Sequence, residues 1–443
     1  MTVSHPDPVE LARFMRGDLV SHDNRQMVRY LLTTWRACHG EMENLWGGGN
    51  RPAGSEYAVA LASGFAPLAE RVRHLAAERA RMPELIALLR QLPPDRQRAL
   101  VRSGPGFRSW SLCEWLIEEC FRLAGSDLNQ AEDLANLTVI VSQELAPGLY
   151  GIPLINDLKA RAWSCVGEVL RLLSDLRSAD DAFDRAEGLV AEGTGDALEE
   201  ARVLEGRAAL RRNQHRFAEA HRLLDEVIAI YRQYRDFHLV GRAYVQKGKV
   251  YGAADDLEPA IRWLRKGLGL IDSTRERRLE LAARHSLMLY LEESGRHQEA
   301  WFLLKASRAE FVEHGGELLT LRLRWLEGKI QQTLGFPGEA ETALIQARDG
   351  FIAQGAGFSA ASVSLDLADL YASQGRAAEM RRVAEEMLPI FRSRDIHREA
   401  IAALIVFQQA VRMEKMNVNL LAEINSYLKR ARKDPKLRFE YPV

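Results

Sequence analysis

The feature that most constrains the fold of this chain is an internal repeat with a step of about 40 residues. One set of positions separated by this step holds Ala220, Ala260, Ala300, Ala340 and Met380. Four residues further on, the same step relates Leu224, Leu264, Leu304, Leu344 and Ala384. Twelve residues before the first set lie Ala208, Gly248, Met288, Gly328 and Ala368. Self-similarity at a period of roughly 20–50 residues indicates stacked units, none of which buries its apolar face alone.

The spacing within each unit predicts two antiparallel helices. A small residue, a second small residue twelve positions later and a large apolar residue four positions after that suit helices whose backbones approach closely at the small pair. Gly295, Gly335 and Gly375 lie between the two halves of their units, where a turn is required. An earlier unit, with Gly167, Ala179 and Phe183, joins the series with a step of 41 residues.

These residues resemble the tetratricopeptide repeat (TPR), in which a large residue early in helix A precedes a small one and helix B carries alanine. One unit matches this pattern through Trp163, Gly167, Leu170, Ala179, Phe183 and Ala186. Another matches through Tyr244, Gly248, Tyr251, Ala260 and Leu264. The resemblance covers roughly residues 155–435, although the unit is longer than the usual repeat of about 34 residues. It implies an all-α fold, a right-handed α-solenoid whose A helices line a concave groove for a partner.

The rest of the chain is expected to be attached to this array. We expect a small helical module at 1–46, a Gly-rich linker at 47–54 and an irregular helical region capping the solenoid at 55–155. The TPR-like repeats follow at 156–395, and capping helices with a basic tail occupy 396–443. Within the irregular region, Pro83 and the Pro93-Pro94 pair predict helix starts. The linker lacks the Lys-Ser/Thr pair of a phosphate-binding P-loop, which favours a flexible joint.

The module at 1–46 resembles a degenerate zinc-binding domain of bacterial anti-sigma factors, because a His-Pro start is followed by two short helices. The resemblance aligns Tyr30 and Trp35 with two of the metal ligands, and only Cys38 keeps a ligating side chain. A structural zinc site uses four donors, so we expect no metal. The alternative is a site built from His5, His22, Cys38 and His39.

The balance of charge argues against a polyanionic partner for the chain as a whole. Sixty basic residues stand against 61 acidic ones, for a net charge of −1. Neither nucleic acid nor a membrane surface is therefore favoured. The basic end, from Lys429 to Arg438, is expected to complement a helix dipole, and a nucleic-acid-binding tail is the alternative. Because the start lacks an apolar signal core and no 18-residue apolar run occurs, we expect a cytoplasmic protein without a membrane span.

No catalytic constellation is present in the sequence. The chain contains no His-Glu-x-x-His, no Gly-x-Ser-x-Gly and no glycine fingerprint after a strand. Neighbouring carboxylates such as Glu292 and Glu293 point about 100° apart on a helix and cannot share a site. We therefore expect a protein that is not an enzyme and needs no cofactor.

Candidate binding residues follow from positions that flank the small residue of helix A. Six positions before it, four of six units carry arginine, and offsets of three and four place the other candidates on the same helix face. Stacked guanidinium groups would hold carboxylates bidentately, and a tryptophan would anchor the interface. The predicted groove residues are Arg161, Arg202, Arg242, Lys249, His285, Arg322, Trp325 and Lys329. The alternative is that these cations pair with glutamates of the wall itself.

Together these features predict an interaction scaffold or regulator that binds an acidic protein or peptide segment. The alternatives are a regulatory subunit that controls a separate effector enzyme such as a protease, and an anti-sigma-like regulator of transcription.

Overall fold

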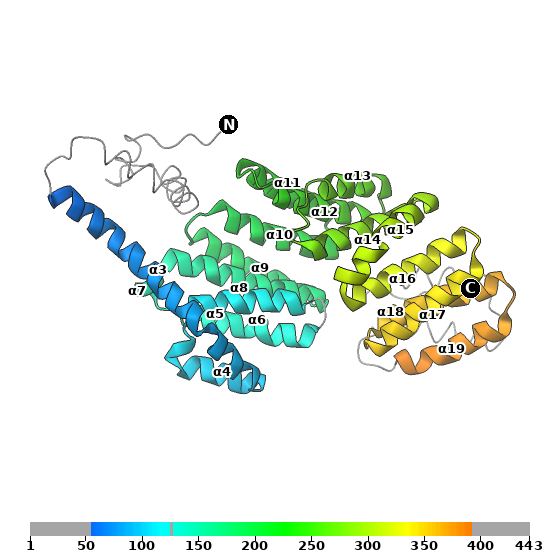
Figure 1. Ribbon diagram of the computed structural model, residues 1–443, viewed down its shortest axis with the longest axis horizontal. Coiled ribbons are helices and arrows are strands. Elements are labelled where there is room, and N and C mark those ends of the chain that lie inside the picture. The colour runs from blue at the N-terminus through cyan, green and yellow to red at the C-terminus, as the bar shows by residue number, and fades with distance from the viewer. Residues whose placement is uncertain (1–54, 125–126, 392–443) are drawn as a thin grey trace.

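The computed structural model describes residues 55–124 and 127–391, and these residues form α-helices and one short 3-10 helix with no strand among them. The chain thus folds as an all-α solenoid of helix pairs stacked along one long direction (Figure 1). The module expected at 1–46, the linker expected at 47–54 and the capping segment expected at 396–443 lie outside the described residues.

The first part of the described chain is irregular. Its elements are α3 (Ser55–Arg90), α4 (Pro94–Ser103), η1 (Pro105–Phe107), α5 (Trp110–Leu123), α6 (Leu128–Gln143) and α7 (Pro147–Tyr150). Pro94 begins α4, as the sequence predicts. Pro83, in contrast, lies inside α3, so the prediction of a helix start there is wrong. A proline removes one hydrogen bond to the carbonyl four residues earlier, and here that carbonyl belongs to the exposed Arg79.

Six helix pairs follow. They are α8 (Ile152–Leu172) with α9 (Leu176–Ala191), α10 (Ala197–Asn213) with α11 (Phe217–Gln233), α12 (Phe237–Ala253) with α13 (Leu257–Leu268), α14 (Arg277–Glu293) with α15 (His297–His314), α16 (Gly316–Thr333) with α17 (Pro337–Ala353), and α18 (Gly357–Ser373) with α19 (Ala377–Phe391). The two helices of each pair pack against each other. We call the first helix of each pair its A helix and the second its B helix.

The small residues of the repeat lie where the two helices of a pair approach most closely. Ala220, Ala260, Ala300 and Ala340 have no exposed surface. A Cβ atom added to Gly248 would stand 2.9 Å from Leu264 Cγ, and one added to Gly328 would stand 2.7 Å from Leu344 Cγ. These distances are shorter than a van der Waals contact, so a larger residue would push the helices apart.

The turn from A helix to B helix requires one residue in the left-handed backbone conformation. In the six pairs this residue is Ser174, His215, Asp255, Gly295, Gly335 and Gly375, with φ between 59° and 84°. Glycine adopts this conformation without strain, whereas other residues meet a steric penalty. The glycines predicted to make turns therefore do so, and three earlier units use other residues at the same place.

The A helices lie on the inner radius of the array. Successive A helices, from α8 with α10 to α16 with α18, contact one another directly, whereas successive B helices approach one another less. Elements on the inside of a curved stack are closer together than those on the outside. The inner wall, as we call it below, is therefore the surface formed by α8, α10, α12, α14, α16 and α18.

Buried apolar residues form a series of clusters along the array instead of one centre. Four of the B helices contribute a large, fully buried aromatic side chain: Phe183, Tyr231, Phe311 and Phe351. Within the described residues, no helix has both the length and the apolar composition that crossing a bilayer requires.

Candidate binding surface on the inner wall

Arg161 and Arg202 are held by a carboxylate of the wall. Arg202 Nη1 donates to Glu199 Oε1 at 2.5 Å, and Arg161 Nε lies 4.0 Å from Glu199 Oε2. Arg161 also reaches Glu114 of α5, at 3.4 Å. Burial raises the pKa of Glu199, and the two guanidinium groups oppose that rise. Both arginines lie on the inner wall, but their charge is already matched.

Arg242 is neutralised more completely. Its Nη2 donates to Glu205 Oε2 at 2.7 Å, and its Nη1 donates to Glu276 Oε1 at 3.3 Å. Glu205 comes from α10, and Glu276 lies next to the start of α14, so this arginine ties three repeats together. The negative charge of Glu205 raises the pKa of the guanidinium well above its ordinary value. The contact is structural.

Lys329 follows the same pattern. Its Nζ lies 2.8 Å from Glu292 Oε2 of α14. Burial opposes the charge of this lysine, but Glu292 outweighs burial and raises its pKa. His285, one repeat earlier, is partly buried on α14.

Arg322 differs from these residues because its guanidinium has no partner within the described part of the chain. It is exposed on α16, and no hydrogen bond or ion pair holds it. The neighbouring atoms of the wall partly desolvate the guanidinium of Arg322, and this lowers its pKa. Three residues on, Trp325 lies on the same face, with Nε1 donating to Asp366 Oδ2 at 2.6 Å and its ring edge-on to Phe351. The structure therefore brings together an unpaired cation and a fixed aromatic ring.

Lys249 is the second cation without a counter-ion, and it lies next to arginines that the sequence prediction omitted. No hydrogen bond or ion pair to its Nζ is formed by the described residues. Burial lowers the pKa of Lys249 to about 8, and the positive charges of Arg212 and Arg171 reinforce this effect. Arg171 and Arg212 both stand four positions after the small residue of their A helices. This shared position could have indicated two further basic residues on the inner wall, but arginine occurs there in only two of the six units.

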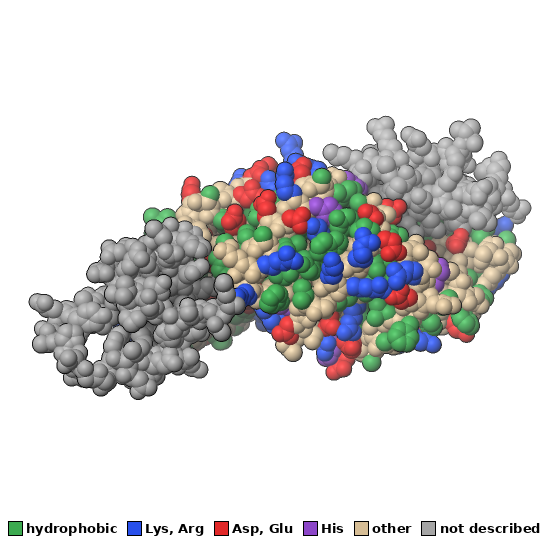
Figure 2. Space-filling view, turned by 90° about the horizontal axis from the view of Figure 1, so that it is seen from above, with side chains coloured by type: hydrophobic (Ala, Val, Ile, Leu, Met, Phe, Trp, Pro, Cys, Tyr) green, Lys and Arg blue, Asp and Glu red, His purple; other side chains and the backbone are tan. Residues whose placement is uncertain are grey.

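The predicted ladder of guanidinium groups is thus interrupted by glutamates of the wall, while Arg322 and Lys249 have no counter-ion in the described part of the array. Figure 2 shows basic, acidic and apolar side chains interleaved over the middle of one face. Within residues 55–124 and 127–391, no three His, Cys, Asp or Glu side chains are grouped in a way that would hold a metal ion.

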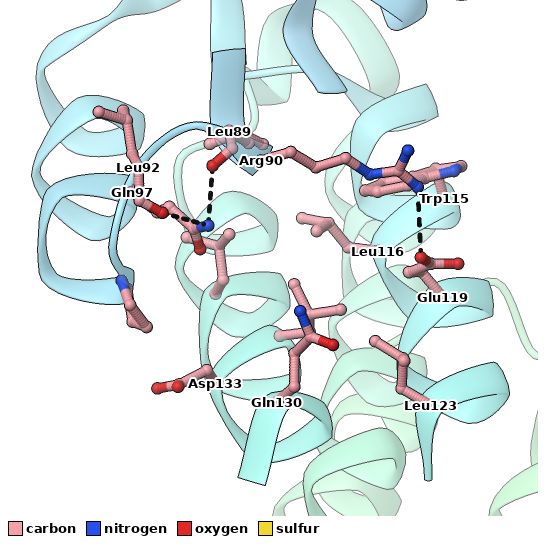
Figure 3. A pocket seen from close by; sticks show the side chains of 13 residues that line it. Leu89, Arg90, Leu92, Gln97, Trp115, Leu116, Glu119, Leu123, Gln130 and Asp133 are labelled. Carbon is pink, nitrogen blue, oxygen red and sulfur yellow. Dashed lines mark hydrogen bonds and ion pairs between the residues drawn. The ribbon is translucent and has the colours of Figure 1, made fainter. Parts of the chain in front are cut away.

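A separate cavity of about 190 Å³ lies at the junction of α3, α4, α5 and α6 (Figure 3). Its polar groups bind the surrounding helices to one another. Gln97 Nε2 donates to the carbonyl oxygens of Leu89 and Leu92, and Arg90 lies over Trp115 while reaching Glu119 at 3.4 Å. These contacts join the end of α3 to α4 and α5, so we interpret the cavity as a feature of helix packing and not as a binding site.

Comparison with known proteins supports the fold at the level of the repeat. A tetratricopeptide-repeat family model matches residues 199–273. No curated protein has a sequence that matches this chain.

Solved structures resemble most of the array. A Rap protein complexed with Competence and Sporulation Factor has 13% sequence identity and a TM-score of 0.54, with 72% of this chain and 87% of that chain covered. The apo form of the quorum sensor NprR from B. thuringiensis has 12% identity, a TM-score of 0.49 and the same coverage of 72% and 87%. NprR in complex with its cognate peptide NprX has 13% identity, a TM-score of 0.45 and coverage of 72% and 85%.

The repeat match, the helix pairs and the likeness to the Rap fold agree with one another: the chain is similar to tetratricopeptide repeats over residues 199–273, and its described residues fold as an all-α solenoid.

Proposed function

We propose that this protein is a non-enzymatic regulator that binds an acidic segment of a partner protein along its inner wall. The observation that carries the proposal is the exposed, unpaired Arg322 beside the fixed ring of Trp325. A guanidinium binds carboxylates bidentately, and arginine and tryptophan are the residue types that dominate interface energetics.

The distribution of unmatched charge suggests how a partner segment lies. Lys249 belongs to α12 and Arg322 to α16, so one repeat separates them. Packed helices lie about 8–10 Å apart, so two steps between A helices span roughly 20 Å. Lys249 lies one position after the small residue of its helix and Arg322 six positions before, which adds about 10 Å along the helix axis. An extended chain advances about 3.3 Å per residue, so two acidic residues about seven positions apart would meet both cations.

The comparisons support a regulator that binds another molecule. The similar Rap protein was solved complexed with Competence and Sporulation Factor, so an array of this shape accommodates a bound factor. A regulatory subunit for an effector enzyme and an anti-sigma-like regulator are forms of this proposal that differ in the partner. We expect the binding to take place in the cytoplasm.

The test is capture of partner proteins from an extract of the native host, quantified by mass spectrometry. Wild-type protein is compared with Arg322→Glu and with Arg262→Glu, which reverses an exposed charge on the B helix α13. Arg322→Glu should lose the partner, and Arg262→Glu should retain it. Equal recovery by all three, with circular dichroism showing intact helices, would contradict the proposal. Reversal of Arg202 or Arg242 is less informative because it also breaks the ion pairs with Glu199 and Glu205.

A further inference from the structure

Three cations from three successive A helices face one region of the inner wall. Arg171 of α8 and Arg212 of α10 lie in the last turns of their helices, and Lys249 lies on α12. Arg212 Nη1 donates to Gln246 Oε1 at 3.4 Å. Gln246 lies three residues before Lys249 and shares its helix face, so the guanidinium of Arg212 reaches the face that carries the ammonium.

The carboxylates of this region are committed to other partners. Glu168 is bound by Arg171, with Nε and Nη2 donating at 2.8 and 2.5 Å. Glu205 accepts from Arg242 at 2.7 Å and from Tyr231 at 3.1 Å. Among the residues that the structure describes, no carboxylate therefore forms an ion pair with Arg212 or Lys249.

A phenol from the next A helix completes the region. The ring of Tyr290, on α14, lies against α12 so closely that a Cβ at Gly252 would stand 2.1 Å from its Cζ and 2.4 Å from its hydroxyl oxygen. No described residue bonds that hydroxyl. Burial raises the pKa of Tyr290 to about 12, although Arg212 opposes the rise, so the hydroxyl keeps its proton as a donor.

We propose that Arg212, Lys249 and Tyr290 form an anion subsite that holds a carboxylate of the partner segment. The subsite rests on the proposed function and adds a second anchor to Arg322. All three groups can donate hydrogen bonds to an anion: a guanidinium and an ammonium are donors only, and the phenol O–H of Tyr290 has no acceptor among the described residues. A carboxylate supplies the acceptors and the charge that this part of the wall lacks.

The lowered pKa values agree with this geometry. Burial lowers the pKa of Arg212 to about 10, and Arg171 adds to the effect. The dipoles of α8 and α10 account for cations in their last turns. They do not account for Lys249, which stands opposite those cations on another helix.

Thermal unfolding in citrate, a small tricarboxylate, tests the subsite without knowledge of the partner. Midpoints are measured in citrate, in phosphate and in sodium chloride at matched ionic strength, for wild type, Arg212→Gln, Lys249→Gln and Tyr290→Phe. Arg262→Gln on α13 is the matched control, because it removes an exposed charge from the opposite side of a helix pair.

Citrate should raise the wild-type midpoint above the chloride value, on the order of 2 °C for a ligand present well above its dissociation constant. The rise should be lost in Arg212→Gln and Lys249→Gln, reduced in Tyr290→Phe and kept in Arg262→Gln. In chloride alone, Lys249→Gln should unfold at a higher temperature than wild type, because it removes a cation from among like charges. A lower midpoint would show that the fold requires the ammonium and would overturn the subsite.

Two other outcomes would also overturn the assignment. Equal stabilisation by phosphate would mean that the subsite takes anions without preference for carboxylate. Equal stabilisation of all variants by citrate would place the effect elsewhere on the surface. Arg322→Glu should keep the citrate effect while losing the partner. If citrate fails to stabilise the wild type while Arg322→Glu loses the partner, only the subsite is refuted. If Arg322→Glu still captures the partner while citrate stabilises the wild type, only the proposed function is refuted.

Discussion

Arg242 of α12 donates to the carboxylate of Glu205 on α10 at 2.7 Å, and this bond neutralises the middle of what the sequence presents as a ladder of arginines. The two residues are 37 positions apart in the chain and belong to adjacent A helices. The pair therefore joins repeats, and its contribution to stability can be measured.

Replacing Glu205 with alanine should destabilise the array by about 2–4 kcal/mol, because it removes the nearer of the two carboxylates that Arg242 contacts and leaves the hydroxyl of Tyr231 without its carboxylate acceptor. Urea unfolding followed by circular dichroism measures the effect. Glu200→Ala, at an exposed position in the first turn of α10, should cost less than about 0.5 kcal/mol. Similar losses for the two variants would show that the buried pair has no special role.

Adding one methyl group at Gly328 should destabilise the protein by about 1–3 kcal/mol, even though alanine is the better helix former. The added Cβ would stand 2.7 Å from Leu344 Cγ on the partner helix. Ala300→Leu should overpack the equivalent contact by a similar amount, since Ala300 is fully buried.

Gly188→Ala is the matched control, because Gly188 is exposed in the last turn of α9 and has nothing near its added Cβ. It should stabilise the protein by about 0.5–1 kcal/mol. Destabilisation at Gly188 as large as that at Gly328 would mean that close helix approach is not the cause.

The left-handed turn position predicts opposite effects in two repeats. Ser174→Gly should stabilise by about 0.5–1 kcal/mol, because serine has a φ of 66° and glycine removes the steric penalty, less the entropy that glycine adds to the unfolded chain. Gly295→Ala should destabilise by about 1 kcal/mol at the equivalent turn, where φ is 80° and nothing crowds the added Cβ. Chemical unfolding of the two variants measures both changes in the free energy of unfolding. Changes of the same sign would contradict this account.

Lys249 should make stability rise with pH in a defined window. Its pKa is lowered to about 8 by burial and by Arg212, whereas the ordinary value is 10.5. Between these values the unfolded chain binds a proton that the folded chain has released, so the free energy of unfolding increases as the pH rises. Between pH 7 and pH 10, the free energy of unfolding of the wild type should increase relative to that of Lys249→Gln by an amount on the order of 1–3 kcal/mol.

Unfolding free energies of wild type and Lys249→Gln at pH 7 and pH 10 measure this difference, because other titrating groups are common to both. A constant difference between them would show that the ammonium keeps an ordinary pKa in the folded protein.

The packing of each helix pair could be predicted from sequence because it depends on residues close together in the chain. The small residue of the A helix, such as Gly248, and the alanine of the B helix, such as Ala260, are 12 positions apart. One antiparallel hairpin brings them into contact whatever the rest of the array does. Pro83 misled the prediction because a proline disrupts a helix only when the lost hydrogen bond cannot be replaced, and solvent exposure is not visible in the sequence.

The candidate site was predicted less well because its electrostatics depend on neighbouring repeats. The sequence places Arg202, Arg242 and Arg322 at equivalent positions, yet the first two form ion pairs with glutamates and the third forms none with any residue that the structure describes. The sequence prediction omitted Arg212 and Tyr290 because their proposed role depends on contacts with residues of another A helix.

The sequence by itself determined the class of fold, the length of the unit and the small residues on which each hairpin closes, since a period of 40 residues and local steric limits suffice for these. Only the tertiary structure decided which cations of the inner wall are neutralised and which keep their charge. Ion pairing depends on the distances between side chains of adjacent helices, and those distances follow from how one repeat stacks on the next.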